Sequence, residues 1–360
     1  MSSVLDRVVA GGPTAGAELP APGAAWDALW PDVIDERVEA LVGLAAAPLP
    51  ADDPRRIMAL DAWAARMQSC VQLERVLLET VAQIDALGAE FRVLKGTAVA
   101  HLDYPDPSWR GFGDVDLLVR AEDYDRIVDG LAATAGTRRR SAEARPGFDR
   151  RYGKGVCLIR PDGAQIDLHR TLATGPFGMT IAPEDLFGPP ERFPVGGVFL
   201  PALGRELRFL HAALHAVLGD SPPRAGALRD VAQLGARPDL DLDAVLATAE
   251  RWRVRGVVAL AVTEAARRFG GDPGPLTDWV ERYRPSRFEA RALAAYVGPD
   301  RSYARQMAAA VRALPGVRAR ADYVWTMLRP DAGYVGARDG SYGARLRRAV
   351  AVRPGGRGAR

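Results

Sequence analysis

The chain has 360 residues, 48% of them hydrophobic, and can therefore bury a sizeable core, which we expect to be divided between two domains. Its formal net charge is only +3, with Arg interspersed among Asp and Glu, so extended nucleic-acid binding is not expected. The two cysteines, Cys70 and Cys157, argue against a disulfide framework or a cysteine-based zinc site and favour a reducing compartment.

Residues 1–25 are rich in Ala, Gly and Pro, and this composition predicts a disordered leader with room for one short helix. The segment does not show the charged region followed by an apolar core that marks a signal peptide. No apolar run in the chain approaches the roughly 18 residues that a membrane span needs. We therefore expect a cytoplasmic protein with no membrane partner.

Residues 26–175 predict an α+β domain that opens with helices. Apolar residues recur at threes and fours over 31–47 and 57–88, and Gly88 ends the second helix. The pattern then changes to short apolar runs separated by turns and two short helices, which favours a mixed sheet flanked by helices. The predicted strands are 91–94, 114–119, 156–160 and 164–169, and the predicted helices between them are 97–102 and 122–131.

Three further regions complete the predicted organisation. Residues 176–204 hold many Pro and Gly and predict a connecting segment. Residues 205–330 show helical periodicity almost throughout and predict an all-helical C-terminal domain. Residues 331–360 are rich in Gly and Arg and predict a basic tail. The predicted helices of the C-terminal domain are about 205–219, 224–235, 241–254, 256–270, 275–283, 286–297, 301–313 and 317–328.

Two aspartates separated by one residue, Asp114 and Asp116, lie at the start of an apolar strand. Residues i and i+2 of a strand point to one face, roughly 6–7 Å apart, so both carboxylates can be directed at one spot. Asp167 lies in another short apolar run and joins them if its strand pairs beside theirs. Carboxylate oxygens are the ligands that Mg²⁺ prefers. The alternative is that these aspartates cap turns at strand ends.

Lysine is rare in this chain: of 48 basic residues only Lys95 and Lys154 are lysines. Lysine supplies a compact point charge that arginine does not replace, so a lysine retained against this bias is a candidate functional residue. Lys95 follows a predicted strand and precedes Gly96 and Thr97. Chance placement remains the alternative for this observation by itself.

An ordered set of motifs accompanies these residues over roughly residues 55–260. The set consists of Leu94-Lys95-Gly96, Tyr104-Pro105, Arg110, Asp114-Val115-Asp116-Leu117-Leu118-Val119, Ile166-Asp167-Leu168-His169, His211, His215 and Leu228-Arg229-Asp230-Val231. The order of elements and motifs resembles the DNA polymerase beta-like nucleotidyltransferase superfamily. Within it, the chain is similar to a bacterial branch marked by a Leu-Lys-Gly motif. The residues 26–175 would then form the catalytic domain.

The resemblance implies that Asp114, Asp116 and Asp167 are catalytic and bind two Mg²⁺ ions. It also implies transfer of a nucleoside monophosphate from a nucleoside triphosphate (NTP) to a hydroxyl-bearing acceptor that the sequence does not identify, with release of pyrophosphate. Two ions about 3.5–4 Å apart would stabilise the attacking and leaving oxygens. Asp114 and Asp116 would hold the ion on the triphosphate, while Asp167 would activate the acceptor hydroxyl through the second ion or as its base.

The expected nucleotide-binding residues are Lys95, Gly96, Thr97, Arg110 and His169. The usual Gly-Gly or Gly-Ser of the superfamily is replaced here by Lys95-Gly96-Thr97. Gly96 still allows backbone amides to approach phosphates, and Lys95 could reach the β- or γ-phosphate. Arg110 suits fork-like phosphate contacts, although it could also be a solvated loop residue. His169 shares a strand face with Asp167, where it could orient a carboxylate, touch substrate or be purely structural.

His211 and His215 lie four residues apart on a predicted helix and so share a face. Without a third ligand this spacing is weak evidence for zinc, and packing or polar contacts near the cleft are favoured. For Asp230 a salt bridge or a buried polar bond is favoured. The alternative function is a catalytically inactive nucleotidyltransferase fold that senses nucleotide or binds a partner.

Overall fold

The computed structural model describes residues 3–134, 136–270, 275–298 and 301–350. In this part of the chain the strands form one mixed sheet with the order β3-β4-β5-β2-β1-β7-β6. The strands are β1 (Phe91–Val93), β2 (Val115–Val119), β3 (Arg138–Arg139), β4 (Gly155–Ile159), β5 (Gln165–His169), β6 (Glu191–Val195) and β7 (Val198–Ala202). Pairs β2–β5 and β1–β7 are parallel, and the others are antiparallel.

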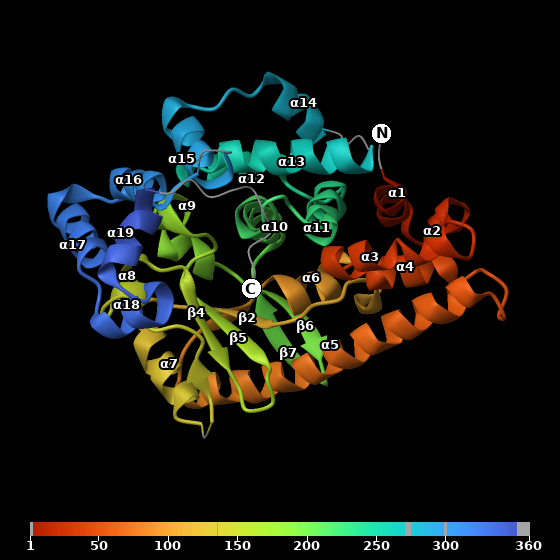
Figure 1. Ribbon diagram of the computed structural model, residues 1–360, viewed down its shortest axis with the longest axis horizontal. Helices are drawn as coiled ribbons and strands as arrows, with labels where there is room; N and C mark the ends of the chain where they lie inside the picture. Colours follow the sequence, from red (N-terminus) through yellow and green to blue (C-terminus); the bar gives the residue numbers. More distant parts are fainter. Residues whose placement is uncertain (1–2, 135, 271–274, 299–300, 351–360) are drawn as a thin grey trace.

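Helices cover both faces of the sheet (Figure 1). Those before and within the strand region are α1 (Val4–Gly11), α2 (Ala24–Asp27), α3 (Trp30–Glu36), α4 (Glu39–Ala46), α5 (Pro54–Ala86), α6 (Lys95–Asp103), α7 (Tyr124–Ala132), α8 (Phe148–Tyr152) and α9 (Gly175–Met179). Short 3-10 helices occupy η1 (Gly12–Glu18), η2 (Pro107–Trp109) and η3 (Pro183–Phe187). The expected α+β class, a mixed sheet flanked by helices, is confirmed.

The C-terminal half of the described chain is helical, as its periodicity predicts. Its helices are α10 (Arg205–Gly219), α11 (Ala225–Gly235), α12 (Leu242–Arg251), α13 (Arg255–Phe269), α14 (Pro275–Arg282), α15 (Arg287–Val297), α16 (Tyr303–Ala313), α17 (Gly316–Leu328), α18 (Ala332–Asp339) and α19 (Tyr342–Val350). Among the described residues, no helix combines the length and the apolar character needed to cross a membrane.

Strand β2 is buried on both faces, and its alternation determines where the carboxylates point. Val115, Leu117 and Val119 belong to the core beneath the long helix α5, whereas Leu118 belongs to the core under α10 to α13. Side chains alternate between faces with period two, so Asp116 shares its face with Leu118. The acidic residues therefore lie on the face covered by the C-terminal helices, opposite α5 (Figure 1).

The expected disordered leader over residues 1–25 is wrong for the described part of that segment. Helix α1 begins with a capping box in which Ser3 and Asp6 bond each other's backbone N–H. Leu5 and Val8 are buried in a core shared with α3 and α4. Asp6 also pairs with Arg268 of α13 at 2.5 Å. The Ala-, Gly- and Pro-rich composition of the segment did not indicate this amphipathic helix, whose apolar side packs against helices later in the chain.

The expected connecting segment over 176–204 contributes strands to the sheet. Strands β6 and β7 form a hairpin, and β7 pairs in parallel with β1 through Val93 and Ala202. In the expected basic tail over 331–360, residues up to 350 form α18 and α19, whose Arg345 pairs with Asp339 at 3.1 Å. Residues 351–360 lie outside the described residues. The division into domains over 26–175 and 205–330 stays a prediction.

Candidate active site

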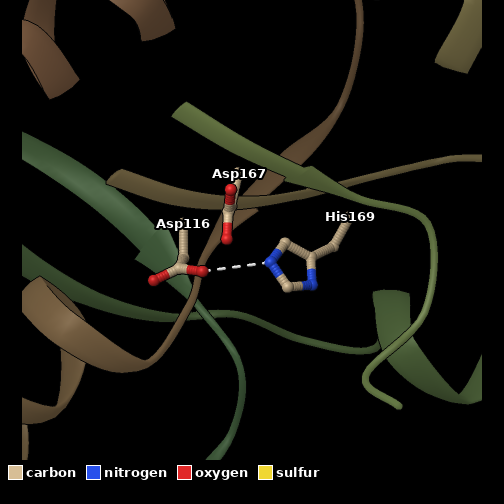
Figure 2. A group of neighbouring side chains, drawn as sticks. All are labelled: Asp116, Asp167 and His169. Carbon is tan, nitrogen blue, oxygen red and sulfur yellow. Dashed lines mark hydrogen bonds and ion pairs between the residues drawn. The ribbon is translucent and has the colours of Figure 1, made fainter. Parts of the chain in front are cut away.

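Asp116 and Asp167 lie directly beside each other on the parallel strands β2 and β5. The condition under which Asp167 joins the motif aspartates, that its strand pairs beside theirs, is therefore met. Ligand atoms of Asp116, Asp167 and His169 all lie within 4.8 Å of one another, and Figure 2 shows the three side chains converging on one point. Asp116 and His169 are buried, while Asp167 is half-buried, so the group is reached from one side.

Asp114 precedes β2 and is not a member of the group formed by Asp116, Asp167 and His169. Its carboxylate approaches the others through Lys95, whose Nζ is 3.8 Å from Asp114 Oδ2 and 2.8 Å from Asp116 Oδ2. Lys95 is held there because it is the first residue of α6, immediately after β1 and next to β2 in the sheet. The ammonium thus bridges the two aspartates of the Asp-Val-Asp motif.

His169 supports the other oxygen of Asp116. The distance from His169 Nε2 to Asp116 Oδ1 is 3.0 Å, so a neutral imidazole donates this hydrogen bond through Nε2–H. Burial lowers the pKa of His169, and the positive charge of Lys154 lowers it further, which keeps the ring neutral despite Asp116. The structure therefore places His169 as a residue that orients a carboxylate; contact with nucleotide stays a prediction.

The neighbours of Asp114 and Asp116 shift the pKa values of these two carboxyl groups in opposite directions. The negative charge of Asp116, followed by burial, raises the pKa of Asp114 to about 6. Burial would raise the pKa of Asp116 too, but Lys95 and the His169 hydrogen bond outweigh it and hold that pKa well below its ordinary value. One ammonium thus does not neutralise all the acidic charge gathered here.

This arrangement fits a divalent cation. A positive charge, the Lys95 ammonium, already occupies the space between two carboxylates, and Asp114 retains a raised pKa in its presence. The carboxylates of Asp116 and Asp167 offer the hard oxygen ligands that Mg²⁺ prefers, and His169 is the third side chain of the group. A buried Asp-Asp-His group able to hold a metal is thus present.

A pocket of about 730 Å³, including space open to solvent, lies beside the carboxylates. Gly96, Lys95 and Asp114 line it on the sheet side, and Tyr104, residues 109–113 and residues of α3, α4, α10 and α11 line most of the rest. A Cβ at position 96 would lie 3.3 Å from Phe112 Cβ, so glycine permits this close approach of the chain. Thr97 is buried behind it. The charged residues of the remaining wall are Glu36, Arg37, Arg110, Asp220, Arg224 and Arg229.

Arg110 lines this pocket, but its guanidinium is engaged by protein groups. Its Nε and Nη2 donate to the two carboxylate oxygens of Asp230 at 3.2 and 2.7 Å, and Nη1 donates to Gly111 O at 3.4 Å. Tyr104 OH donates to the same carboxylate at 2.9 Å. The salt bridge favoured for Asp230 is confirmed, whereas a phosphate-binding role for Arg110 stays a prediction that this pairing disfavours.

Comparison with known proteins identifies the family to which this chain belongs. A family described as uncharacterised nucleotidyltransferases matches residues 22–270. The chain belongs to this family. A solved structure, an antigenic nucleotidyltransferase-like protein from Paracoccidioides brasiliensis, is 13% identical with a TM-score of 0.34, over 61% of this chain and 95% of that one. No curated protein matches the chain.

In this nucleotidyltransferase family member, Lys154 is a neighbour of the site that does not belong to the ordered set of motifs. It immediately precedes β4, and its carbonyl accepts a hydrogen bond from Arg170 N at 2.9 Å, beside the register pair Gly155–His169. Burial and the charge of Lys95 lower the pKa of Lys154 to about 8. Both lysines of the chain thus lie around one carboxylate group, and lysine scarcity was the signal that could have identified Lys154.

His211 and His215 of α10 approach the same nucleotidyltransferase site from the helical side. The rings of His211 and His169 have centroids 6.4 Å apart, and His215 lines the pocket. Burial, followed by the charges of the two lysines, lowers the pKa of His215 well below its ordinary value. The metal-capable group found in the described residues does not include either residue, and the packing role favoured from the sequence stays a prediction.

Proposed function

We propose that this protein is a Mg²⁺-dependent nucleotidyltransferase that transfers a nucleoside monophosphate from an NTP to a hydroxyl-bearing acceptor and releases pyrophosphate. The observation that carries the proposal is the register pair of Asp116 and Asp167 beside a pocket that also exposes Lys95 and Asp114. Family membership supports the reaction class. The bacterial branch marked by the Leu-Lys-Gly motif and a cytoplasmic location remain parts of this proposal.

Three aspartates have metal-binding roles in this proposal. Asp116 and Asp167 would hold the ions, and Asp114, which lines the pocket, would join them. Bound Mg²⁺ would neutralise the charge that develops on the phosphoryl oxygens. His169 keeps the Asp116 carboxylate in orientation through its Nε2–H.

The chain supplies positioning and proton transfer around the triphosphate. Lys95 leaves Asp116 for the β- or γ-phosphate, and Gly96 lets the backbone at the start of α6 approach the same oxygens. Asp167, half-buried at the edge of the group, accepts the proton of the attacking acceptor hydroxyl. The acceptor then carries the nucleoside monophosphate, and pyrophosphate leaves from the side that Lys95 serves.

One observation favours a second candidate, a nucleotide-binding module without transfer. The Lys95 ammonium lies 2.8 Å from Asp116 Oδ2 and supplies a positive charge where a metal ion would bring its own. A protein that kept this ion pair throughout would bind nucleotide and never release pyrophosphate.

The test is calorimetric titration of the full chain with non-hydrolysable analogues of ATP, GTP, CTP and UTP, with and without Mg²⁺. We expect Mg²⁺-dependent binding of at least one analogue and its loss in Asp116→Asn, which keeps the shape of the side chain. Asp162→Asn, in the hairpin between β4 and β5 and away from this pocket, is the control and should bind as the wild type does. Metal-independent binding in Asp116→Asn would contradict the proposal.

Pyrophosphate release separates the two candidates. The same protein is incubated with the hydrolysable NTP, Mg²⁺ and fractionated small-molecule and macromolecular acceptors. Release that requires Asp167 supports transfer. Tight binding with no release in any fraction favours the binding module.

A further inference from the structure

Two arginines line the same pocket, but only one of them, Arg110, is paired with an acidic residue of the described chain. Arg110 is the one that the motifs pointed to, yet Asp230, Tyr104 and Gly111 occupy its surroundings. Arg229 is the neighbour of Asp230 on α11 and lines the same pocket as Lys95, Gly96 and Asp114. In the described part of the chain, Arg229 makes no hydrogen bond or ion pair, and its Nε is buried without a partner.

An unpaired guanidinium whose Nε is removed from water is costly. Arg229 is half-buried as a residue, but its buried Nε–H lacks the hydrogen bond that water would otherwise supply, and such an unsatisfied donor is destabilising. Asp230, its neighbour in the sequence, is already bound in a two-pronged pair with Arg110. Arg229 is therefore a donor whose partner must come from outside the described protein groups.

The other cations at this wall have protein partners. Lys95 pairs with Asp116, and Arg224, just before α11, pairs with Asp220 at 3.4 Å. An anion that enters this pocket therefore meets one guanidinium that gives up no existing bond to bind it. Arginine presents several N–H groups in a planar fork that matches phosphate oxygens.

Resting on the proposed function, we infer that Arg229 binds the phosphate chain of the NTP and is the phosphate-recognising arginine of this site. Its side chain also borders a second, largely apolar pocket lined by Val231, Val262 and Phe269. That pocket offers a phosphate no other cation, whereas the first pocket offers Lys95 and the metal-capable carboxylates. The phosphate is therefore placed in the first pocket.

This assignment gives α11 a part in the chemistry of the sheet. Lys95 and Gly96 approach the phosphates from the end of β1, and Arg229 approaches them from the helical half. Recognition of the triphosphate thus depends on both layers. The contribution of Arg229 to affinity should therefore depend on how many phosphates the nucleotide carries.

The experiment titrates wild type, Arg229→Gln, Arg229→Lys and Arg224→Gln with the tightest-binding non-hydrolysable NTP analogue and with the matching diphosphate and monophosphate. Charged hydrogen bonds of about 1.5–3 kcal/mol correspond to a roughly 10- to 150-fold loss of triphosphate affinity in Arg229→Gln. The gain in affinity from monophosphate to triphosphate should shrink in Arg229→Gln and be partly restored in Arg229→Lys. Arg224→Gln, the matched control with an existing partner, should keep most of that gain.

The outcomes separate this inference from the proposed function. If Arg229→Gln and Arg229→Lys bind all three nucleotides like the wild type while Asp116→Asn does not bind, the inference is wrong and the proposed function stands. Equal losses for all three nucleotides would also overturn it, because they would indicate a structural change of the pocket. If wild-type protein binds no NTP, the proposed function fails first and the inference with it. Thermal unfolding of each variant verifies folding, and Arg229→Lys carries the test if Arg229→Gln does not fold.

Discussion

The site is built from charged residues whose roles depend on which partner each one meets. Arg110 and Arg229 carry the same side chain and line one pocket, yet Asp230 engages only Arg110. Lys95 is similarly defined by its contact with Asp116. Because buried charges require partners, the pairing pattern separates structural cations from those left available for a ligand.

The Arg110–Asp230 pair gives a prediction about stability. Replacing Arg110 with Ala leaves the buried Asp230 carboxylate without its cation, and we expect the free energy of unfolding to fall by about 3–5 kcal/mol. Arg110→Met combined with Asp230→Leu should lose less, because both charges then disappear together. Urea unfolding of the wild type, Arg110→Ala, Arg110→Met, Asp230→Leu and the double variant measures the coupling between the two side chains.

An exposed ion pair provides the control for this cycle. Arg75 and Glu79 lie on the surface of α5, with side chains 65% and 39% exposed, so Arg75→Ala should change stability by no more than about 0.5 kcal/mol. A similarly small effect of Arg110→Ala would show that the pair with Asp230 is not a structural link.

At the scale of elements, strand alternation and helix docking have different origins. The apolar and acidic alternation of β2 follows directly from its own residues, since the strand places odd and even positions on opposite faces. Helix α1, by contrast, acquires its role through Leu5 and Val8 in a core shared with α3 and α4, and through Asp6 against Arg268. A short helix of this kind is stable only when packed.

The docking of α1 predicts a large effect of a small change near the N-terminus. Leu5 is 4% exposed, so Leu5→Ala removes buried methyl groups and leaves a cavity, and we expect a loss of about 2–5 kcal/mol in stability. Ile34 lies in the same group of helices but is 52% exposed, and Ile34→Ala should change stability by no more than about 0.5 kcal/mol. Chemical denaturation measures both. If both variants lost equally little stability, residues 3–11 would not be packed against the core.

At the scale of the whole molecule, the sheet and the C-terminal helices share one core. Leu94 and Leu118 from the strand region lie in the same cluster as Phe209 and Leu210 of α10. Strand β7, which directly precedes α10, pairs with β1 and lies one strand from the β6 edge of the sheet. The pocket itself is closed by both layers, so its shape depends on their remaining packed together.

This shared core predicts that sheet and C-terminal helices unfold together. Differential scanning calorimetry should give one transition for both layers, with a calorimetric enthalpy close to the van't Hoff enthalpy. Binding of the NTP analogue with Mg²⁺ should shift that transition upward as a unit, because the proposed binding pocket is lined by residues of both layers. Two resolved transitions, with only one shifted by ligand, would indicate independent domains.

What the amino-acid sequence determined by itself is the set of local elements and the motif that marks the site. Helical and strand periodicity reflect neighbours a few residues apart, so the strands around Asp116 and Asp167 and the C-terminal helices were predictable. That these two strands pair was only a condition for the site, and the register of β2 and β5 meets it.

Only the tertiary structure decided which distant groups meet. In the folded chain β6 and β7 join the sheet, and α1 packs against the core. Lys154 lies beside the carboxylates. Asp230 pairs with Arg110, while Arg229 is unpaired in the described chain. These contacts join residues far apart in sequence, and no short-range pattern encodes which of several arginines reaches a given carboxylate. The physical reason is that charge pairing and helix docking depend on the packing of the whole chain, whereas alternation depends on local backbone geometry.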